Sequence, residues 1–413
     1  MKQSIPGGYY DALHTTTTEY NCLSGGREWV NDPDDVAQTV SVPGTLRNLR
    51  IELNDVPGTG TYVFSLYRAV GTGAWGVTTL TCTVAADGTV ASDTEHDVSV
   101  AAGDVICLQC NPDSPDNARY ARCSIDFEGD NANESLMLVH SAGYSFADSY
   151  AGVNGYVIET DENYTRQVCP TAGKIKCLHV QLETDPGTPP DAYRIVLRIN
   201  GADSDDGGGN ALECTIVAND RTGNDTTHEI TVAAGDVLTL HIERIDSPSN
   251  SPQISIGMAF VADTDGESII SGGKNETLSR SATRYNVLAS ASDMPWTATE
   301  AQCYSLLGAC TLKKLYFLLT AAPGAGNKYT FSVRVNSADP GSGLSVVVAD
   351  AATTGNDTTN TVTVAAGDDV NLKSVPDSIP DSAQAHWGMV CYIAVVAVGV
   401  PAQAMHLMRM RRE

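Results

Sequence analysis

The histidines of this chain are the first residues to test for acid–base chemistry, because a side chain that titrates near neutral pH can carry protons. His96 and His228 occupy equivalent places in a repeated sequence pattern, but the third equivalent place holds Asn360. A polar side chain near a turn explains all three residues. The sequence also lacks a Gly-x-Ser-x-Gly elbow, a His-Glu-x-x-His motif and a phosphate-binding glycine loop. We therefore expect no enzymatic activity.

The 11 cysteines offer a second possible chemistry. Cys107 and Cys110 have the spacing of two zinc ligands, but residues i and i+3 of a strand point to opposite faces of a sheet. A disulfide framework essential to a repeated module should recur in every copy, but Cys82/Cys214 and Cys169/Cys303 are the only equivalent positions and neither extends to a third copy. We expect most of them to be small, buried hydrophobic side chains.

The segment Asp203–Asn210 reads Asp-Ser-Asp-Asp-Gly-Gly-Gly-Asn and is the best candidate for a metal site. Clustered carboxylates on a glycine-rich loop can surround a hard cation such as calcium with oxygen ligands. Asp203, Asp205 and Asp206 are therefore candidate calcium ligands. The alternative is a solvated surface loop, because the equivalent loops elsewhere in the chain are not comparably acidic. We expect no cofactor.

The two ends of the chain are candidates for contacts with other subunits. The last residues form a basic, methionine-rich tail on an acidic protein, and flexible methionine side chains adapt well to a partner surface. The candidate assembly residues are Met405, Met408, Arg409, Arg411 and Arg412. Residues 1–18 could form an arm that extends to a neighbour. The alternative for the tail is a frayed terminus.

These candidate residues belong to a repeated framework. Val-Ala-Ala-Gly-Asp occurs at Val100–Asp104, Val232–Asp236 and Val364–Asp368, with successive motif glycines 132 residues apart. A fixed period of this size indicates one domain built three times. We predict domains at residues 1–133 (with the N-terminal arm), 134–266 and 267–402, followed by the tail 403–413.

Each repeat has the pattern of a β-domain. Tyr329–Asn336 alternates apolar and polar residues, which is typical of a strand with one solvated face. Val-Ala-Ala-Gly-Asp predicts a tight turn between two strands, with its glycine in a left-handed conformation and its aspartate bonded to the turn backbone. We predict an all-β chain of three tandem β-sandwich domains, jelly-roll-like and about 132 residues each.

A family resemblance is clearest in the third repeat, at Thr311–Tyr316, Pro323–Gly326, Tyr329–Phe331, Val364–Asp368 and Trp387–Met389. The second repeat keeps Ile256-Gly257-Met258, whereas the first has Cys123-Ser124-Ile125. On these residues the sequence resembles repeated β-modules of uncharacterised phage virion proteins of the decoration or fibre type. The strand–turn pattern is also similar to the jelly roll of complement-type and tumour-necrosis-factor-like trimers. Since no matching motif is catalytic, the resemblance implies a structural role.

Composition excludes some partners. Fifty acidic and 25 basic residues give a net charge of −25, which opposes nonspecific binding to nucleic acid. The first ten residues have no signal-peptide core, and the longest apolar run is too short for a membrane-spanning helix. We therefore expect no membrane partner. We expect the protein to be made in the host cytoplasm, released by lysis and located in the virion; an extracellular location is the alternative.

The sequence thus predicts a non-enzymatic phage virion protein that decorates or reinforces a capsid or tail. Its partners would be other virion subunits, as a homo-oligomer or bound to capsid or tail protein. One alternative is a carbohydrate- or receptor-binding surface or fibre module, for which Trp75 and Trp296 are the residues to change. Another is a self-assembling extracellular filament subunit, in which a terminal strand completes the sheet of its neighbour. The sequence leaves open whether the repeats form a compact triangle or a rod.

Overall fold

The computed structural model describes residues 2–26, 28–141, 148–156, 158–274, 276–289, 295–341 and 343–394. Within these ranges the strands form six sheets, and helical structure is confined to three short 3-10 helices at Pro33–Val36, Glu162–Tyr164 and Glu300–Gln302. The prediction of an all-β, sandwich-like chain is confirmed. No helix in these ranges is long and apolar enough to cross a bilayer.

Residues 2–129 form the first sheet pair, in which two sheets enclose one hydrophobic cluster. The first sheet has the strand order β1 (Lys2–Ala12), β9 (Tyr120–Gly129), β4 (Gly44–Leu53) and β7 (Val90–Val100). The second has the order β2 (Glu19–Asn21), β8 (Val105–Asp113), β5 (Thr61–Ala69) and β6 (Trp75–Val84), and β3 (Gln38–Thr39) also pairs with β8. Side chains along β4 alternate between buried and half-buried, because successive residues of a strand point to opposite faces.

The same strand order recurs in the second sheet pair, formed by residues 134–262. Its first sheet runs β12 (Gly155–Tyr156), β10 (Glu134–Ser141), β21 (Ile254–Ala262), β15 (Gly173–Leu182), β19 (Thr222–Val232). Its second runs β13 (Ile158–Glu159), β11 (Ser149–Ala151), β20 (Val237–Ile245), β16 (Ala192–Ile199), β17 (Ala202–Asp203), with β14 (Gln167–Val168) on β20 and β18 (Glu213–Val217) on β16. A second hydrophobic cluster lies between these sheets.

Residues 267–392 form the third sheet pair around a third cluster. Its first sheet runs β22 (Glu267–Gly273), β30 (Ala385–Tyr392), β25 (Cys310–Leu319), β28 (Thr354–Val364). Its second runs β23 (Arg284–Asn286), β29 (Asp369–Asp377), β26 (Gly324–Val335), β27 (Ser345–Asp350), with β24 (Ser305–Leu306) on β29. Strands β4, β15 and β25 carry a bulge at one equivalent position, where Asn48, Cys177 and Lys314 adopt φ values of 54°, 55° and 53°.

The N-terminal segment differs from the arm expected from the sequence. Residues 2–12 form β1, which pairs antiparallel with β9 of the same sheet pair instead of extending to a neighbour. Strand β1 lies at the edge of its sheet, where Pro6 is tolerated because an edge strand can leave one side of its backbone without ladder hydrogen bonds. The Pro-Gly-Gly sequence therefore marks an edge strand.

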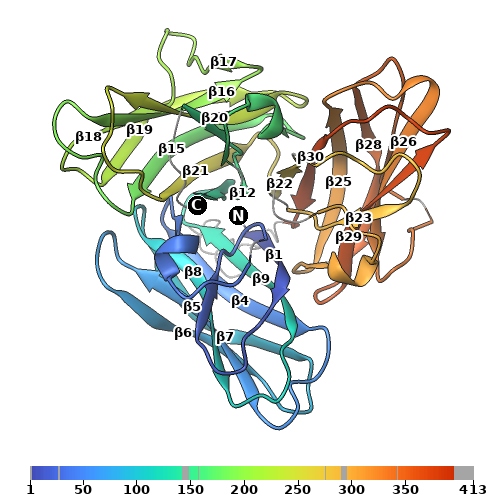
Figure 1. The fold of residues 1–413 in the computed structure, drawn as a ribbon, viewed down its shortest axis with the longest axis horizontal. Coiled ribbons are helices and arrows are strands. Elements are labelled where there is room, and N and C mark those ends of the chain that lie inside the picture. The colour runs from blue at the N-terminus through green and yellow to red at the C-terminus, as the bar shows by residue number, and fades with distance from the viewer. Residues whose placement is uncertain are drawn as a thin grey trace, which may run out of the picture.

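The three sheet pairs surround a common centre and form a compact triangle, so the chain is not a rod (Figure 1). Strands β1, β10 and β22 contact one another there. Around this centre, β3 packs on β21 and β10 of the second pair, and β14 packs on β30 and β22 of the third. Strand β24 packs on β9 and β1 of the first pair, which closes the ring. We call this last contact the closing interface.

Candidate functional site

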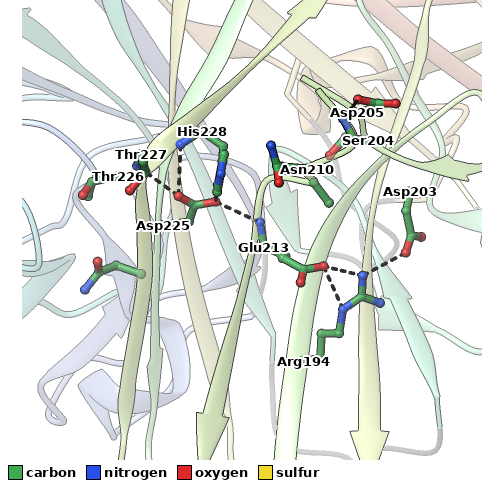
Figure 2. Close-up of a pocket in the computed structure, with 13 residues that line it drawn as sticks. Arg194, Asp203, Ser204, Asp205, Asn210, Glu213, Asp225, Thr226, Thr227 and His228 are labelled. Atoms are coloured by element: carbon green, nitrogen blue, oxygen red, sulfur yellow. Dashed lines mark hydrogen bonds and ion pairs between the residues drawn. The ribbon is translucent and has the colours of Figure 1, made fainter. Parts of the chain in front are cut away.

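A surface groove of about 700 Å³ lies on the second sheet pair (Figure 2). Strands β16, β17 and β18 contribute Arg194, Asp203 and Glu213, and the loop after β17 contributes Ser204 and Asp205. The opposite wall is the part of β19 that carries Asp225 and His228. The groove therefore contains two of the three candidate calcium ligands and one of the two repeated histidines.

The structure gives each candidate calcium ligand a different set of protein donors. Asp203 accepts hydrogen bonds from Arg194 (3.0 Å) and Arg198 (2.7 Å). Burial alone would raise the pKa of Asp203, but these two arginines lower it below its ordinary value. Asp205 accepts from the backbone of residues 207 and 209, and Asp206 from the backbone of residues 208 and 210.

Those backbone bonds close the glycine-rich loop on itself. Across the described ranges, no group of three or more His, Cys, Asp or Glu side chains is arranged to hold a metal ion. Calcium binding by Asp203, Asp205 and Asp206 stays a prediction.

The polar side chains of the groove form hydrogen bonds and ion pairs with one another and with the backbone. The guanidinium of Arg194 contacts Glu213, Glu243 and Asp203, so its charge is compensated. The hydroxyl of Ser204 accepts a hydrogen bond from the backbone N–H of Leu212 at 3.0 Å. The groove can accept weak polar contacts, but Ser204 is not paired with a base that would activate it as a nucleophile.

His228 belongs to a hydrogen-bond arrangement that occurs three times. Its Nδ1 lies 2.9 Å from Asp225 Oδ2, and this carboxylate also accepts three backbone N–H bonds, from residues 213, 227 and 228. Asp93 has the same donors in the first sheet pair, including His96. In the third pair, Asn360 Nδ2 donates to Asp357 Oδ2 at 2.9 Å.

A histidine or an asparagine therefore has the same role at this position. Its side chain orients a buried aspartate, whose carboxylate accepts hydrogen bonds from backbone N–H groups. The sequence prediction that His96, His228 and Asn360 are polar side chains near a turn is wrong in their location, because they lie within strands β7, β19 and β28. The sequence comparison did not identify the aspartate itself as the central residue, although it is present in all three repeats.

Asp357→Ala is expected to lower the free energy of unfolding by about 1–3 kcal/mol, because three backbone N–H groups lose their acceptor. Burial opposes ionisation, but the hydrogen bonds from Asn360, Ser345 and Thr359 lower the pKa of Asp357 from 3.8 to about 2. Its contribution is thus complete above the unfolded pKa and is lost as the pH falls through 3.8 towards 2.

Urea unfolding at several pH values measures both effects. Asp87→Ala, at an exposed position in a turn, is the control and is expected to change stability by less than about 0.5 kcal/mol. Equal losses in the two variants would contradict the capping role of Asp357.

The Val-Ala-Ala-Gly-Asp motif forms the predicted turn. Gly103, Gly235 and Gly367 have φ values of 88°, 94° and 89°. The motif aspartates Asp104, Asp236 and Asp368 accept a hydrogen bond from the backbone N–H three residues earlier, at 2.7–2.8 Å. The glycine N–H also donates to the chain that follows β3, β14 or β24, at the carbonyls of Val40 (2.8 Å), Cys169 (2.8 Å) and Leu307 (3.4 Å). The turn thus supports the strand that contacts the next sheet pair.

Two glycines permit the closest contacts between sheet pairs. A Cβ added to Gly257 on β21 would lie 2.0 Å from the carbonyl oxygen of Thr39, and one added to Gly388 on β30 would lie 1.8 Å from that of Val168. By strand register, the equivalent residue of the first pair is Ser124 on β9. Its hydroxyl is buried without a hydrogen-bond partner. The closing interface therefore differs from the other two.

A second set of equivalent residues also differs at each interface. Ser255 Oγ lies 2.6 Å from Thr39 Oγ1 between the first and second pairs. His386 is fully buried between the second and third pairs, where burial lowers its pKa to about 4. Arg122, at the closing interface, contacts Glu52 at 2.7 Å and Asp369 at 2.9 Å. The sequence did not identify Ser255, His386 and Arg122 as interface residues, because their equivalent positions become visible only in the strand register.

The remaining sequence predictions concern tryptophans, cysteines and the tail. Trp296, named as a possible sugar platform, is 4% exposed in the third core, so that assignment is wrong. Trp75 is half-buried and stacks on Tyr67, with ring centroids 5.5 Å apart. All 11 cysteines are free and all but Cys177 are buried.

Cys107 and Cys110 belong to different hydrophobic clusters, as opposite strand faces require. The assembly candidates in the tail, Met405, Met408, Arg409, Arg411 and Arg412, lie outside the described residues.

The chain was also compared with known proteins. No model of a known protein family matches it, and no curated protein matches it.

Proposed function

We propose that this chain is a non-enzymatic structural protein of a phage virion, which decorates or reinforces a capsid or tail. In this proposal the three sheet pairs are copies of one jelly-roll domain of about 132 residues, with boundaries near residues 133 and 266. The main strands follow the same order in all three pairs, with β12, β13 and β17 as additions in the second, and this supports the division. The virion assignment itself rests on the sequence resemblance.

The observation that carries a structural role is the closure of the ring. Each pair places one short strand, β3, β14 or β24, against the first sheet of the next pair. Hydrogen bonds cross these contacts, from Gln3 to Leu136, from Ser271 to Gln167 and from Gly308 to Ser4. One chain thus reproduces the arrangement of a closed cyclic trimer. The surfaces through which the sheet pairs contact one another are buried inside the ring. Further assembly must then use outer surfaces or the tail.

The hydrogen-bonding of the polar residues supports a role without catalysis. The repeated aspartates Asp93, Asp225 and Asp357 each accept three backbone hydrogen bonds, and Ser204 in the groove is engaged with Leu212. The acidic surface implied by a net charge of −25 keeps a protein soluble at the high local concentration of a virion surface. The partners would be capsid or tail protein, or further copies of the chain.

Immunogold electron microscopy of lysates from the producing cells tests this proposal. Antibodies raised against the purified full-length chain should label capsids or tails. Label confined to filaments would favour the self-assembling alternative, and label confined to cell surfaces or soluble protein would contradict a virion role.

Add-back experiments on stripped particles then test the tail. Full-length chain should rebind, and Arg409→Gln/Arg411→Gln/Arg412→Gln should rebind at least tenfold less, equivalent to about 1.4 kcal/mol. Arg284→Gln, which changes an arginine on β23 of the third sheet pair, is the control. Equal rebinding by all three proteins would exclude a basic-tail contact.

A further inference from the structure

A second hollow, of about 230 Å³, lies within the closing interface. Tyr120 and Arg122 on β9 and Asn54 after β4 line its wall on the first sheet pair, and Gln302 and Tyr304 line its wall on the third. It is separate from the groove of Figure 2, which lies wholly on the second sheet pair. The repeated aspartates do not contribute to it.

The equivalent place between the first and second sheet pairs is almost filled. Strand register makes Ser255 the counterpart of Arg122. There, Ser255 contacts Thr39 directly, Gln253 reaches the carboxylate of Asp35, and only about 20 Å³ is left. The larger space at the closing interface is therefore a property of its own residues and not of the fold.

The wall of this pocket combines aromatic rings with polar groups. Tyr120 is 41% exposed, the highest value of any aromatic residue among the exposed large hydrophobics of the described chain. Tyr304 lies under the guanidinium of Arg122, 5.0 Å from ring centroid to the guanidinium carbon. The amide of Asn54 is fixed because its Oδ1 accepts from the backbone N–H of Tyr120 at 2.9 Å. Gln302 Oε1 accepts from Thr297 Oγ1 at 3.3 Å.

The cation of the pocket wall, Arg122, is already paired with carboxylates. Arg122 contacts two carboxylates, those of Glu52 and Asp369, so the wall offers neither a free cation for an anionic ligand nor an isolated anion for a cationic one. An uncharged ligand with hydroxyl groups suits such a wall, because it needs neither a free cation nor a free anion.

We propose that this pocket binds one ring of a neutral saccharide. Tyr120 supplies a rigid, amphipathic ring against which the C–H face of a sugar can pack. Asn54, Gln302 and Arg122 supply planar hydrogen-bonding groups for its hydroxyls. Pockets for drug-sized ligands enclose roughly 300–1,000 Å³, so 230 Å³ suits a single ring and not a buried oligosaccharide. Saccharide binding here does not depend on a virion role.

Saturation-transfer NMR on the full-length chain tests this site, with glucose, galactose, mannose and N-acetylglucosamine as separate probes. At least one should bind with a Kd of about 1 mM, as expected for a single ring with few contacts. Tyr120→Ala should weaken that binding at least tenfold, whereas Tyr120→Phe should retain it because the ring remains. Val347→Ala, at an exposed position on β27, is the control and should bind like the parent.

Three outcomes would overturn the proposal. The first is the absence of transfer to all four sugars at concentrations of about ten times that Kd. The second is equal binding by Tyr120→Ala and Val347→Ala, which would place the sugar elsewhere. The third is binding of glucuronate but of no neutral sugar, which would show that the pocket selects a charge. Because Tyr120 is exposed, the alanine variant is expected to fold, and unchanged circular dichroism checks this.

Discussion

Arg122→Ala is expected to lower the free energy of unfolding by about 2–4 kcal/mol, slightly less than the loss from a fully buried ion pair. The guanidinium is 13% exposed and lies between Glu52 and Asp369, which are 22% and 23% exposed. Its removal leaves two carboxylates facing each other across the closing interface without a cation. Urea unfolding measures the loss, and faster amide exchange in β24 and β9 should locate it at this interface.

Arg47→Met provides a matched control for this experiment. Arg47 also contacts two carboxylates, Asp97 and Glu128, but these are 55% and 38% exposed and lie within the first sheet pair. Exposed ion pairs of this kind contribute about 0–1 kcal/mol. If Arg122→Ala lowered the free energy of unfolding no more than Arg47→Met does, the ion pairs of Arg122 with Glu52 and Asp369 would not hold the ring closed.

Asp369, which pairs with Arg122, predicts a pH dependence of stability opposite in sign to that of Asp357. Burial, opposed by Arg122 and reinforced by Glu52, raises the pKa of Asp369 from 3.8 to about 6. Between these values the folded state binds more protons than the unfolded state, so this contribution to stability is present at low pH and is lost as the pH rises through 6. Asp369→Asn is expected to remove that dependence, and unfolding between pH 3 and 8 measures it.

Gly388→Ala is expected to cost about 3 kcal/mol, at the upper end for an added methyl group in a packed interface. The new Cβ would lie 1.8 Å from the carbonyl oxygen of Val168, and a backbone atom cannot rotate aside as a side chain can. The second and third sheet pairs must move apart for it to fit. The free energy of unfolding measures the cost, and amide exchange in β14 and β30 should increase.

Gly76→Ala separates this steric effect from the general effect of replacing glycine. Gly76 lies on β6, and a Cβ added there meets no atom within 4 Å. Neither glycine has a positive φ, so neither substitution strains the backbone. We expect Gly76→Ala to stay within about 0.5 kcal/mol of the parent. If Gly388→Ala were equally harmless, the contact between β14 and β30 would not be as close as the structure places it.

Local patterns in the sequence predicted local structure well. Alternation predicted strands such as β26, and the motif glycines Gly103, Gly235 and Gly367 have the left-handed conformation that a tight turn requires. His96, His228 and Asn360 share a hydrogen bond to a nearby aspartate, whereas the sequence had indicated only polar side chains near a turn. In each case the determining interactions lie within a few residues along the chain.

Features that depend on distant segments were not predictable in this way. The importance of Gly388 depends on the carbonyl of Val168, which lies 220 residues earlier in the sequence. The pairing of Arg122 with Asp369 joins the first and third sheet pairs. Residues 2–12 looked irregular because of Pro6-Gly7-Gly8, yet pairing with β9 makes them a strand. The hydrogen bonds that Asp203 accepts from Arg194 and Arg198 could not be inferred from its acidic neighbours in the sequence.

The difference between Arg122, Ser255 and His386 has a consequence for valency. In a trimer of identical chains, any residue placed at an interface appears three times, and so does any pocket that it creates. Here the three equivalent positions are encoded separately, so the 230 Å³ pocket is present at the closing interface, and its counterpart between the first and second sheet pairs is almost filled. The pocket therefore distinguishes the closing interface from the interface between the first and second pairs. A ligand bound there would mark one edge of the three-lobed molecule and give it an orientation.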